Sequence, residues 1–284
     1  GWGMRLGSTG SVAVWRGMYA RHRLDISVAD ISLGVLSCGR RLRREEMEGE
    51  VLRLCSLEEE GLVCFSARSG WDLWLGAHGL RAGDEVLVSA ITHPDMVRII
   101  HEHGLRAVPV DIDPEALAPR PWMLEAALTP RTRVVLVAHL FGGRMDLGGV
   151  AKFARERGLL LVEDCAQAFQ GPEKMGDPAA DVSMYSFGTL KTSTALGGAV
   201  LRVRDREVLG RMRGIQASYP TQGRGGYLKK LLKVLGLVAV SQPRPYGVLA
   251  RACTRFGSDL DALVGGVVRG FPPPEPAATF FRHL

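Results

Sequence analysis

The sequence predicts an α/β fold built around a mostly parallel central sheet. Short apolar runs, each about the length of one buried strand, alternate along the chain with longer amphipathic stretches. Several of these stretches stop at a glycine, a residue that commonly follows the last turn of a helix. Strands that alternate with helices are typical of a sheet covered by helices on both faces. Functional residues of such folds gather at the carboxyl ends of the strands, so the residues after each strand are the first candidates.

After a helix expected at 44–58, the elements follow one another in a regular order from residue 61 onward. Consecutive apolar residues such as Val86, Leu87 and Val88 indicate a buried strand. Pro94 suits the first turn of a helix, and Gly104 suits the position just after its end. We expect strands at 63–66, 85–90, 107–112, 134–140, 159–163, 182–187 and 199–203. We expect helices at 44–58, 69–78, 94–103, 122–128, 147–157 and 205–217.

The two ends of the chain differ from this alternating middle. Residues 1–45 look irregular and basic, and the glycine-rich stretch 223–226 is a candidate linker. Beyond it the strand pattern fades and helices are expected at about 227–240 and 246–268. The sequence therefore predicts three parts, which are an N-terminal segment at 1–45, a large domain at 46–220 and a partial helical C-terminal region at 221–284.

Composition limits the class of protein. The chain is 46% hydrophobic and 23% charged, as expected for a globular protein. Its longest apolar candidate for a span, residues 234–240, is far shorter than the roughly 20 residues that a bilayer requires, so we expect no membrane span. The five cysteines form no CxxC pair and show no zinc-site spacing, which predicts reduced thiols and no metal. We expect a cytoplasmic protein without a signal peptide.

The net charge of +6 is unevenly distributed. Residues 211–284 hold eleven Lys or Arg and only three Asp or Glu. This excess is consistent with a solvated basic face, and also with a surface that meets phosphorylated or nucleotide-linked substrates. Nucleic acid is the least favoured partner, because no aromatic-interleaved basic motif accompanies the charge.

The first chemical candidate is Asp164, which follows the apolar run at 160–162. A carboxylate at the carboxyl end of a buried strand can hold the pyridine nitrogen of pyridoxal 5'-phosphate (PLP) in its protonated form. The alternative is an Asp that caps the following helix, which is a common role. Asp164 alone does not distinguish these two roles.

The second candidate is Lys191, which lies five residues after Ser186 at the end of another expected strand. Lys191 is the single charged residue between Val182 and Val200, so a role in solubility explains it poorly. A lysine can form an imine with the cofactor's aldehyde, and a serine hydroxyl can bind its phosphate. The glycines at 197–198 allow close backbone packing beside this site.

The third candidate is the strand-to-helix junction at 66–70, with the sequence SARSG. The free N–H groups of a helix N-terminus favour a phosphate. The junction lacks the GxxxxGK[ST] pattern of a P-loop, and the chain has no GxGxxG dinucleotide motif. Alone, this signal is weak.

Taken in order, these motifs resemble the DegT/DnrJ/EryC1/StrS family of PLP-dependent sugar aminotransferases. The resemblance extends over about residues 60–215. It rests on the junction at 66–70, GDEV at 83–86, VDID at 110–113, AHLFG at 138–142, EDCAQA at 163–168, and SF at 186–187 followed by Lys191. It implies a PLP fold type I large domain and PLP as the cofactor.

The resemblance also implies roles for individual residues. Lys191 would hold the cofactor covalently and transfer protons. Asp164 would pair with the ring nitrogen, and Gln167 would lie near the cofactor's 3'-oxygen. Three further residues, Ser186, Ala67 and Arg68, would bind the phosphate. The position where the family carries an aromatic residue stacked on the ring is occupied here by His93.

Two departures from the family pattern bear on function. The chain lacks the family's Gly-x-Asn-x-Arg stretch after the lysine, and residues 223–230 supply no matching Asn. The family's small domain runs well beyond residue 284, and the first residue here is Gly rather than Met. We therefore expect the chain to be part of a longer protein.

The resulting expectation is an aminotransferase that moves an amino group from an amino acid, with glutamate expected, to a keto-sugar, with a nucleotide-linked sugar expected. The resemblance implies a homodimer. One alternative is another reaction of the same fold, namely a lyase, a desulfurase or an acyl transferase. The other is a catalytically degenerate relative that serves as a binding protein.

Overall fold

A computed structural model describes residues 24–40, 43–221 and 223–256. The chain divides into two compact units. The sheet unit contains the described residues from 43 to 223, and the helical unit contains residues 24–40 together with 224–256. Two segments far apart along the chain, 24–40 and 224–256, thus belong to one unit, a grouping that the sequence division into separate segments did not anticipate.

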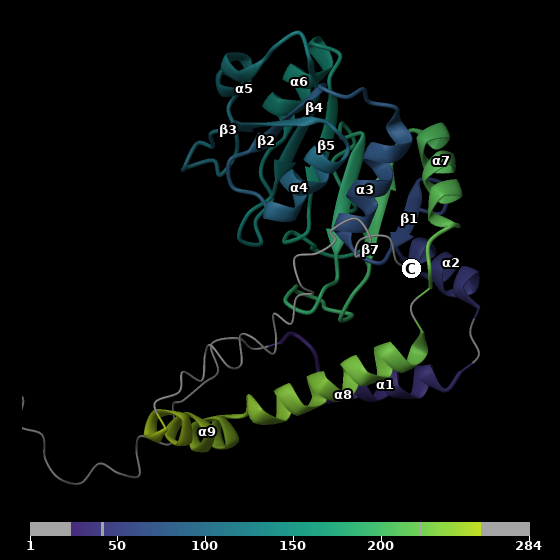
Figure 1. Ribbon diagram of the computed structural model, residues 1–284, viewed down its shortest axis with the longest axis vertical. Coiled ribbons are helices and arrows are strands. Elements are labelled where there is room, and N and C mark those ends of the chain that lie inside the picture. Colours follow the sequence, from purple (N-terminus) through teal and green to yellow (C-terminus); the bar gives the residue numbers. More distant parts are fainter. Residues whose placement is uncertain (1–23, 41–42, 222, 257–284) are drawn as a thin grey trace, which may run out of the picture. The chain divides into compact units, whose positions relative to one another are not determined.

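The sheet unit is built on seven strands in the order β1-β7-β6-β5-β4-β2-β3 (Figure 1). Strands β2 to β6 pair in parallel, and β7 runs antiparallel to both β6 and β1. The prediction of a mostly parallel α/β sheet is therefore confirmed. The strands are β1 (Gly61–Cys64), β2 (Glu85–Ser89), β3 (Arg106–Val110), β4 (Thr132–Ala138), β5 (Leu160–Asp164), β6 (Val182–Ser186) and β7 (Ala199–Val203).

Helices cover both faces of the sheet because alternate strand residues point to opposite faces. Val86 and Val88 belong to a core shared with α3, α4 and α7, whereas Leu87 belongs to a second core with α5 and α6 (Figure 1). All three residues are at most 2% exposed, which explains why this strand is apolar without interruption. The helices are α2 (Arg44–Leu54), α3 (Ala67–His78), α4 (Pro94–Glu102), α5 (Pro121–Ala127), α6 (Gly148–Glu156) and α7 (Arg206–Gln216).

Two tryptophans fix α3 in the first core. Trp71 and Trp74 are buried and stacked, with ring centroids 5.4 Å apart. The Trp71 Nε1–H donates to the backbone oxygen of Met96 in α4 at 3.2 Å, which satisfies the buried indole. This packing ties α3 to α4, and the N-termini of both helices lie at the edge of the sheet where the candidate site residues gather.

The helical unit consists of α1 (Val28–Cys38), α8 (Arg224–Val240) and α9 (Pro243–Arg255). The prediction of irregular structure was wrong for α1. The Ser27 hydroxyl accepts from the Asp30 N–H at 3.1 Å, and the Asp30 carboxylate accepts from the Ser27 N–H at 2.9 Å. This capping box was the missed signal, because such reciprocal bonds define a helix start. Residues 1–23 and 257–284, including the end of the helix expected at 246–268, lie outside the described residues.

Helices α1 and α8 approach closely at one glycine. A Cβ atom on Gly34 would lie 2.9 Å from Cδ2 of the buried Leu231, so a larger residue at position 34 would force the Leu231 side chain to move. Among the described helices, none is both long enough and apolar enough to cross a membrane. All five cysteines are free thiols, as the sequence predicts.

Candidate active site

The candidate residues lie at the carboxyl edge of the sheet. Asp164 is the last residue of β5, Ser186 is the last residue of β6, and Lys191 lies in the turn that follows β6. Ala67 and Arg68 open α3, and His93 caps α4. The structure brings together four charged or titratable groups, because Lys191, His93, Asp164 and Arg68 interact electrostatically.

Asp164 is buried, and this burial raises the pKa of its carboxyl group above the usual range. The two largest influences that oppose this shift come from Ala166 and Lys191. The Ala166 N–H donates to Asp164 Oδ1 at 2.9 Å, and the positive charge of Lys191 favours the carboxylate. A cation placed next to this group would offset the cost of its burial, which is the interaction that a protonated pyridine nitrogen supplies.

Lys191 is also largely removed from water. Burial lowers the pKa of its ammonium group, the Asp164 carboxylate raises that pKa, and the Arg68 cation lowers it. A lysine with a lowered pKa is more often the neutral amine, which is the nucleophilic form. The side chain is therefore prepared for covalent chemistry with a carbonyl.

A tight turn sets the position of Lys191 relative to Ser186. The Lys191 N–H donates to the Gly188 carbonyl at 2.9 Å, and the Thr194 hydroxyl donates to the same oxygen at 2.8 Å. A Cβ atom on Gly188 would lie 3.6 Å from Ser186 Oγ and 3.9 Å from Lys191 Cγ. The glycine thus lies between the serine hydroxyl and the lysine side chain, within contact distance of both.

The N-terminus of α3 is the candidate phosphate site. The Ser66 hydroxyl accepts a hydrogen bond from the Ser69 N–H at 3.1 Å and so caps the start of α3. Ala67 and Arg68 are the first two helical residues, where backbone N–H groups have no intrahelical acceptor. Such groups, with the helix dipole behind them, attract an anion.

Arg68 has a partner that the sequence did not reveal. Its Nη1 lies 2.6 Å from Oδ2 of Asp95, in the first turn of α4. Asp95 also pairs with Arg98 at 2.8 Å. The guanidinium is therefore held beside the junction rather than left to extend into water. The signal is weak in sequence, because the two residues are distant along the chain and meet only when α3 packs on α4.

His93 caps α4 through its ring. Nδ1 accepts from the Asp95 N–H at 3.2 Å, which requires that nitrogen to be unprotonated. Burial lowers the pKa of the imidazole, the Asp95 carboxylate opposes that shift, and Arg68 and Lys191 add to it. Burial, both cations and the capping bond thus favour the neutral ring, which leaves a flat uncharged group near Lys191 and Asp164.

Two buried hydroxyl groups at or just after the end of β2 lack hydrogen-bond partners among the described residues, as expected if a polar cofactor binds there. They are Ser89 Oγ, at the end of β2, and Thr92 Oγ1, beside His93. An unsatisfied buried hydroxyl costs about 1–3 kcal/mol. These two groups and the buried Asp164 carboxylate fit a ligand that brings its own hydrogen-bonding atoms and a cationic nitrogen, as PLP does.

Gln167 lies at the rim of the site and is exposed. Its Oε1 accepts from the Phe141 N–H at 3.3 Å, so the glutamine supports the loop after β4. The N–H groups of the Gln167 amide are the ones available to a ligand. Its role near the 3'-oxygen stays a prediction.

The sequence reasoning missed a second carboxylate beside Asp164. Glu163 is completely buried and accepts four hydrogen bonds. They come from His139 Nε2 at 2.7 Å, Ser183 Oγ at 2.7 Å, the Asp177 N–H at 2.9 Å and Arg144 Nη2 at 2.9 Å. Burial alone would raise the pKa of Glu163, but the bonds from His139, Ser183 and the Asp177 N–H hold it well below the usual range.

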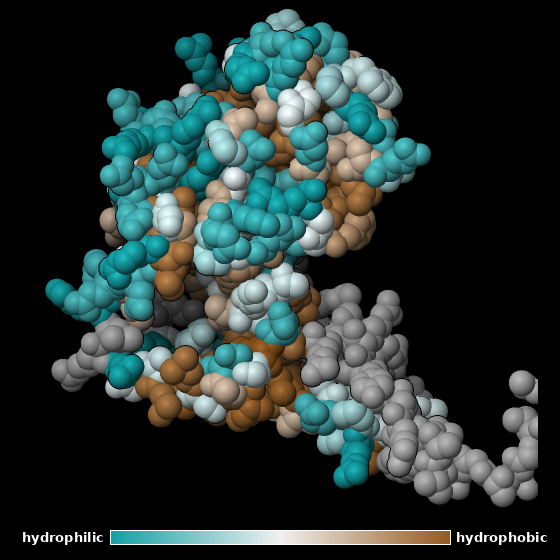
Figure 2. Space-filling view, turned by 180° about the vertical axis from the view of Figure 1, so that it is seen from behind, coloured by the Kyte–Doolittle hydropathy of each residue, from teal (hydrophilic) through white to brown (hydrophobic). Residues whose placement is uncertain are grey.

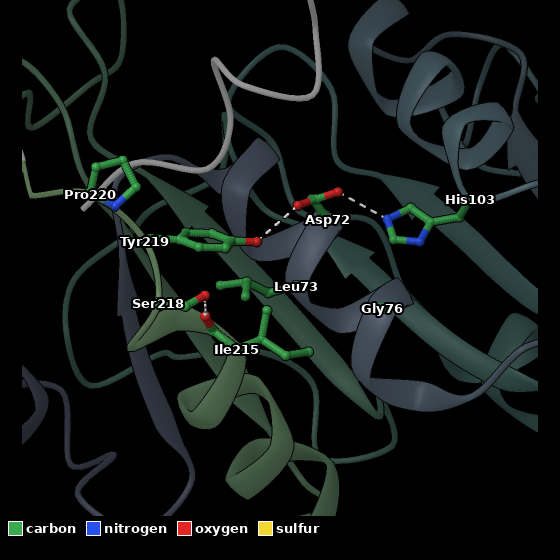
Figure 3. A pocket seen from close by; sticks show the side chains of 8 residues that line it. All are labelled: Asp72, Leu73, Gly76, His103, Ile215, Ser218, Tyr219 and Pro220. Carbon is green, nitrogen blue, oxygen red and sulfur yellow. Dashed lines mark hydrogen bonds and ion pairs between the residues drawn. The ribbon is translucent and has the colours of Figure 1, made fainter.

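A hollow elsewhere on the sheet unit does not include the candidate residues. It has a volume of about 430 Å³ and lies between α3, the end of α4 and the end of α7 (Figure 3). Asp72 faces it, and this carboxylate accepts from Tyr219 Oη at 3.1 Å and pairs with His103 Nε2 at 2.9 Å. Both oxygens are thus engaged by side chains that hold the helices together.

Solved structures share this architecture. The aminotransferase TlmJ from Streptoalloteichus hindustanus is 28% identical, with a TM-score of 0.61 over 71% of this chain and 57% of that chain. The sugar aminotransferase CalS13 from Micromonospora echinospora is 28% identical, with a TM-score of 0.59 over 70% of this chain and 57% of that chain. The fold is therefore that of the PLP-dependent enzymes of fold type I.

The family can be stated more closely. The model of the DegT/DnrJ/EryC1/StrS aminotransferase family matches residues 34–234, which is most of the chain. The protein belongs to this family, whose cofactor is PLP.

Curated relatives agree with the family. The L-glutamine:2-deoxy-scyllo-inosose aminotransferase of Streptomyces fradiae is 36% identical over 54% of this chain and 36% of its own length. The UDP-N-acetyl-3-dehydro-alpha-D-glucosamine 3-aminotransferase of Acidithiobacillus ferrooxidans is 32% identical over 60% of this chain and 47% of its own length. The chain thus spans less than half the length of either relative.

Proposed function

We propose that the protein, within its complete chain, is a PLP-dependent aminotransferase that moves an amino group from an amino acid to a keto-sugar. The observation that carries the proposal is the placement of Lys191 and Asp164 near each other at the ends of neighbouring parallel strands. A partly desolvated lysine and a buried carboxylate interact at the carboxyl edge of a fold type I sheet. Titratable groups with shifted pKa values at the carboxyl ends of parallel strands are candidates for a functional site.

The proposed roles follow from the surroundings of each side chain. PLP supplies an electron sink that stabilises negative charge on the substrate carbon next to the nitrogen. Lys191 would hold the cofactor through its side-chain nitrogen and would move the proton on that carbon. Asp164 would lie against the ring nitrogen, and its charge would favour the protonated form of that nitrogen.

Other residues would orient the cofactor. The N–H groups of Ala67 and Arg68, the Arg68 guanidinium and the Ser186 hydroxyl would bind the phosphate. The His93 ring would stack on the pyridine, and the Gln167 amide would donate to the 3'-oxygen. Ser89 and Thr92, whose buried hydroxyls have no partner among the described residues, would complete this contact surface.

The substrate class rests on the relatives. Their names describe amino transfer to an inosose and to a UDP-linked sugar, which supports a keto-sugar acceptor, with a nucleotide-linked sugar favoured. Glutamate is the proposed donor. A homodimer and a cytoplasmic location complete the proposal. The alternatives are a lyase, desulfurase or acyl transferase reaction and a non-catalytic binding role.

The decisive experiment is reduction of the holoenzyme with borohydride followed by peptide mass analysis. The proposal expects visible absorbance from the bound cofactor and a reduced adduct at Lys191. Lys191→Ala should lose both signals, whereas Lys152→Ala, an exposed lysine on α6, should keep them. An adduct at another lysine, or no cofactor absorbance in the unchanged protein, would overturn the proposal.

Addition of amino acids separates the reaction classes. An aminotransferase should convert the bound cofactor to its pyridoxamine form with glutamate and release 2-oxoglutarate in equal amount. A lyase or desulfurase would instead release an eliminated fragment without that conversion, and a binding relative would show neither change.

A further inference from the structure

We propose that the helical unit binds the surface of an anionic membrane. The proposal goes beyond amino transfer and rests on helices α8 and α9, which lie outside the candidate active site. These helices carry exposed apolar side chains next to a row of cations. Helices with that combination lie in the plane of a membrane interface without crossing it.

Helix α8 has a buried side and an exposed apolar side. Leu231 and Val234, 1% and 2% exposed, are its buried residues, and Leu231 meets α1 at Gly34. On another side, Leu232 is 56% exposed and Leu235 is 37% exposed, three residues apart on one helical face. Among the described residues of the unit, packing accounts for one side of α8 and leaves a second apolar stripe exposed.

Cations border this open stripe. Lys229 and Lys233 are exposed and lie one turn apart along α8. Lys230 is partly buried, and that burial, together with the nearby charge of Lys233, lowers the pKa of its ammonium group. Anionic groups brought to this surface would relieve the repulsion between Lys230 and Lys233.

Helix α9 repeats the arrangement. Val248 is 58% exposed and Phe256 is 80% exposed, and their spacing of eight residues places them on one side. Arg244, Arg251 and Arg255 recur at intervals of seven and four residues, which lines them up along the adjacent edge. An apolar side bordered by arginines is the pattern expected where apolar groups enter the acyl boundary and guanidinium groups meet phosphates.

Helix α1 also carries exposed apolar side chains. Leu33 is 62% exposed and Leu36 is 70% exposed, three residues apart. Figure 2 shows apolar side chains gathered over the helical unit on the face drawn there. Apolar side chains gathered on a surface mark an interaction site in a globular protein.

The charge of the unit selects the partner. The described residues of the unit, 24–40 and 224–256, contain eight Lys or Arg and two Asp. A second copy of the unit would bring the same cations against the same stripe, so electrostatic repulsion would oppose pairing. Anionic phospholipid headgroups complement this charge, and each cation near such a surface strengthens attachment about fivefold.

Vesicle sedimentation tests the proposal. The full chain should sediment with vesicles of phosphatidylcholine and phosphatidylglycerol but not with phosphatidylcholine alone. Raising the salt concentration from about 0.1 M to about 1 M should weaken binding, because the screening length falls from about 10 Å to about 3 Å. Equal binding to both vesicle types, or none to the anionic ones, would overturn the proposal.

Two variants with matched controls locate the surface. Lys229→Gln with Lys233→Gln should weaken vesicle binding roughly 30-fold, about fivefold for each charge, whereas Lys152→Gln with Lys174→Gln, exposed lysines of the sheet unit, should leave it unchanged. Leu232→Ser with Leu235→Ser should abolish binding, whereas Leu54→Ser, 68% exposed on α2, should not. If the leucine variant instead lowers the molar mass in solution and vesicle binding persists, the stripe contacts a second copy and the proposal fails.

Discussion

The two carboxylates at the end of β5 occupy opposite faces of the sheet and have opposite surroundings. Glu163 accepts four hydrogen bonds, and its pKa lies well below the usual range. Asp164 accepts one from the Ala166 N–H, and burial raises its pKa. The protein satisfies the first carboxylate with its own donors and leaves much of the second available for a ligand.

This difference separates structural from functional burial. A buried charge is costly unless partners surround it. On the Glu163 side the partners come from β6, from the loop after β4 and from the segment before β6, so the carboxylate joins parts of the fold. On the Asp164 side the expected partner is the protonated nitrogen of the cofactor. Burial of the carboxylate therefore destabilises the folded protein until the cofactor binds.

The largest expected effect is on catalysis at Asp164. Asp164→Asn removes the charge that would hold the ring nitrogen protonated, and loss of such a buried partner is worth about 3–5 kcal/mol. The rate of the glutamate half-reaction, followed by cofactor absorbance, should fall about 10²- to 10⁴-fold. Asp111→Asn, an exposed residue just after β3, serves as the control and should react at the unchanged rate. A full rate in Asp164→Asn would contradict the assigned role.

Stability should respond most strongly at Glu163. Glu163→Gln leaves His139 and Arg144 without their anionic partner, so the free energy of unfolding should fall by about 3 kcal/mol. Thermal unfolding should then begin roughly 6–12 °C lower. Glu156→Gln, whose side chain is 53% exposed, should change the free energy by less than about 0.5 kcal/mol. A destabilisation no larger than that of this control would show that the network contributes little.

The pH dependence of the apoprotein should show opposite signs for the two groups. The folded-state pKa of Glu163 lies below its ordinary value of 4.5, so its stabilisation is present above about pH 4.5 and is lost as the pH falls further. The folded-state pKa of Asp164 lies above its ordinary value of 3.8, so its ionisation disfavours folding at neutral pH.

Urea unfolding at pH 7 and below pH 4 measures this contrast. Asp164→Asn should raise the free energy of unfolding of the apoprotein at pH 7, and this gain should disappear below pH 4. Glu163→Gln should lower the free energy of unfolding at pH 7, and this loss should become smaller below pH 4. Shifts of the same sign for both variants would remove the distinction between the two carboxylates.

The smallest expected effect is at His93, which has two separable functions. His93→Asn keeps a side chain that can cap α4 but removes the ring, so affinity for PLP should fall about 2- to 10-fold while stability is kept. His93→Phe keeps a ring but loses the cap, so stability should fall by about 1 kcal/mol while affinity is kept. Equal affinity in both variants would exclude stacking.

The sequence predicted the sheet and the cluster around Lys191 because both depend on local patterns. Apolar runs set the strands, and strand ends place Asp164 and Lys191 at one edge. The Glu163 network escaped prediction because its donors come from separate stretches of the chain that converge only in the folded sheet. The pairing of Arg68 with Asp95 was missed for the same reason, since it depends on how α3 packs on α4.

The sequence analysis also missed α1, because the pattern that indicates this helix is short. Helix α1 depends on one capping box and on burial of Ile31. Its apolar pattern is brief and lies in a basic segment without other signs of regular structure, so the sequence alone did not predict a helix. Its partner, α8, lies at the other end of the described chain. No pattern within either segment indicates that they belong to one unit.

The pairing of α1 with α8 has a consequence for the order of events during synthesis. Translation completes α1 early, but the residues that cover it appear only after the whole sheet unit has left the ribosome. Contacts between such distant segments form slowly, because the intervening chain must first be brought together. Ile31 and its neighbours on α1 therefore stay uncovered until α8 has been synthesised, and apolar surface exposed in this way is prone to aggregation.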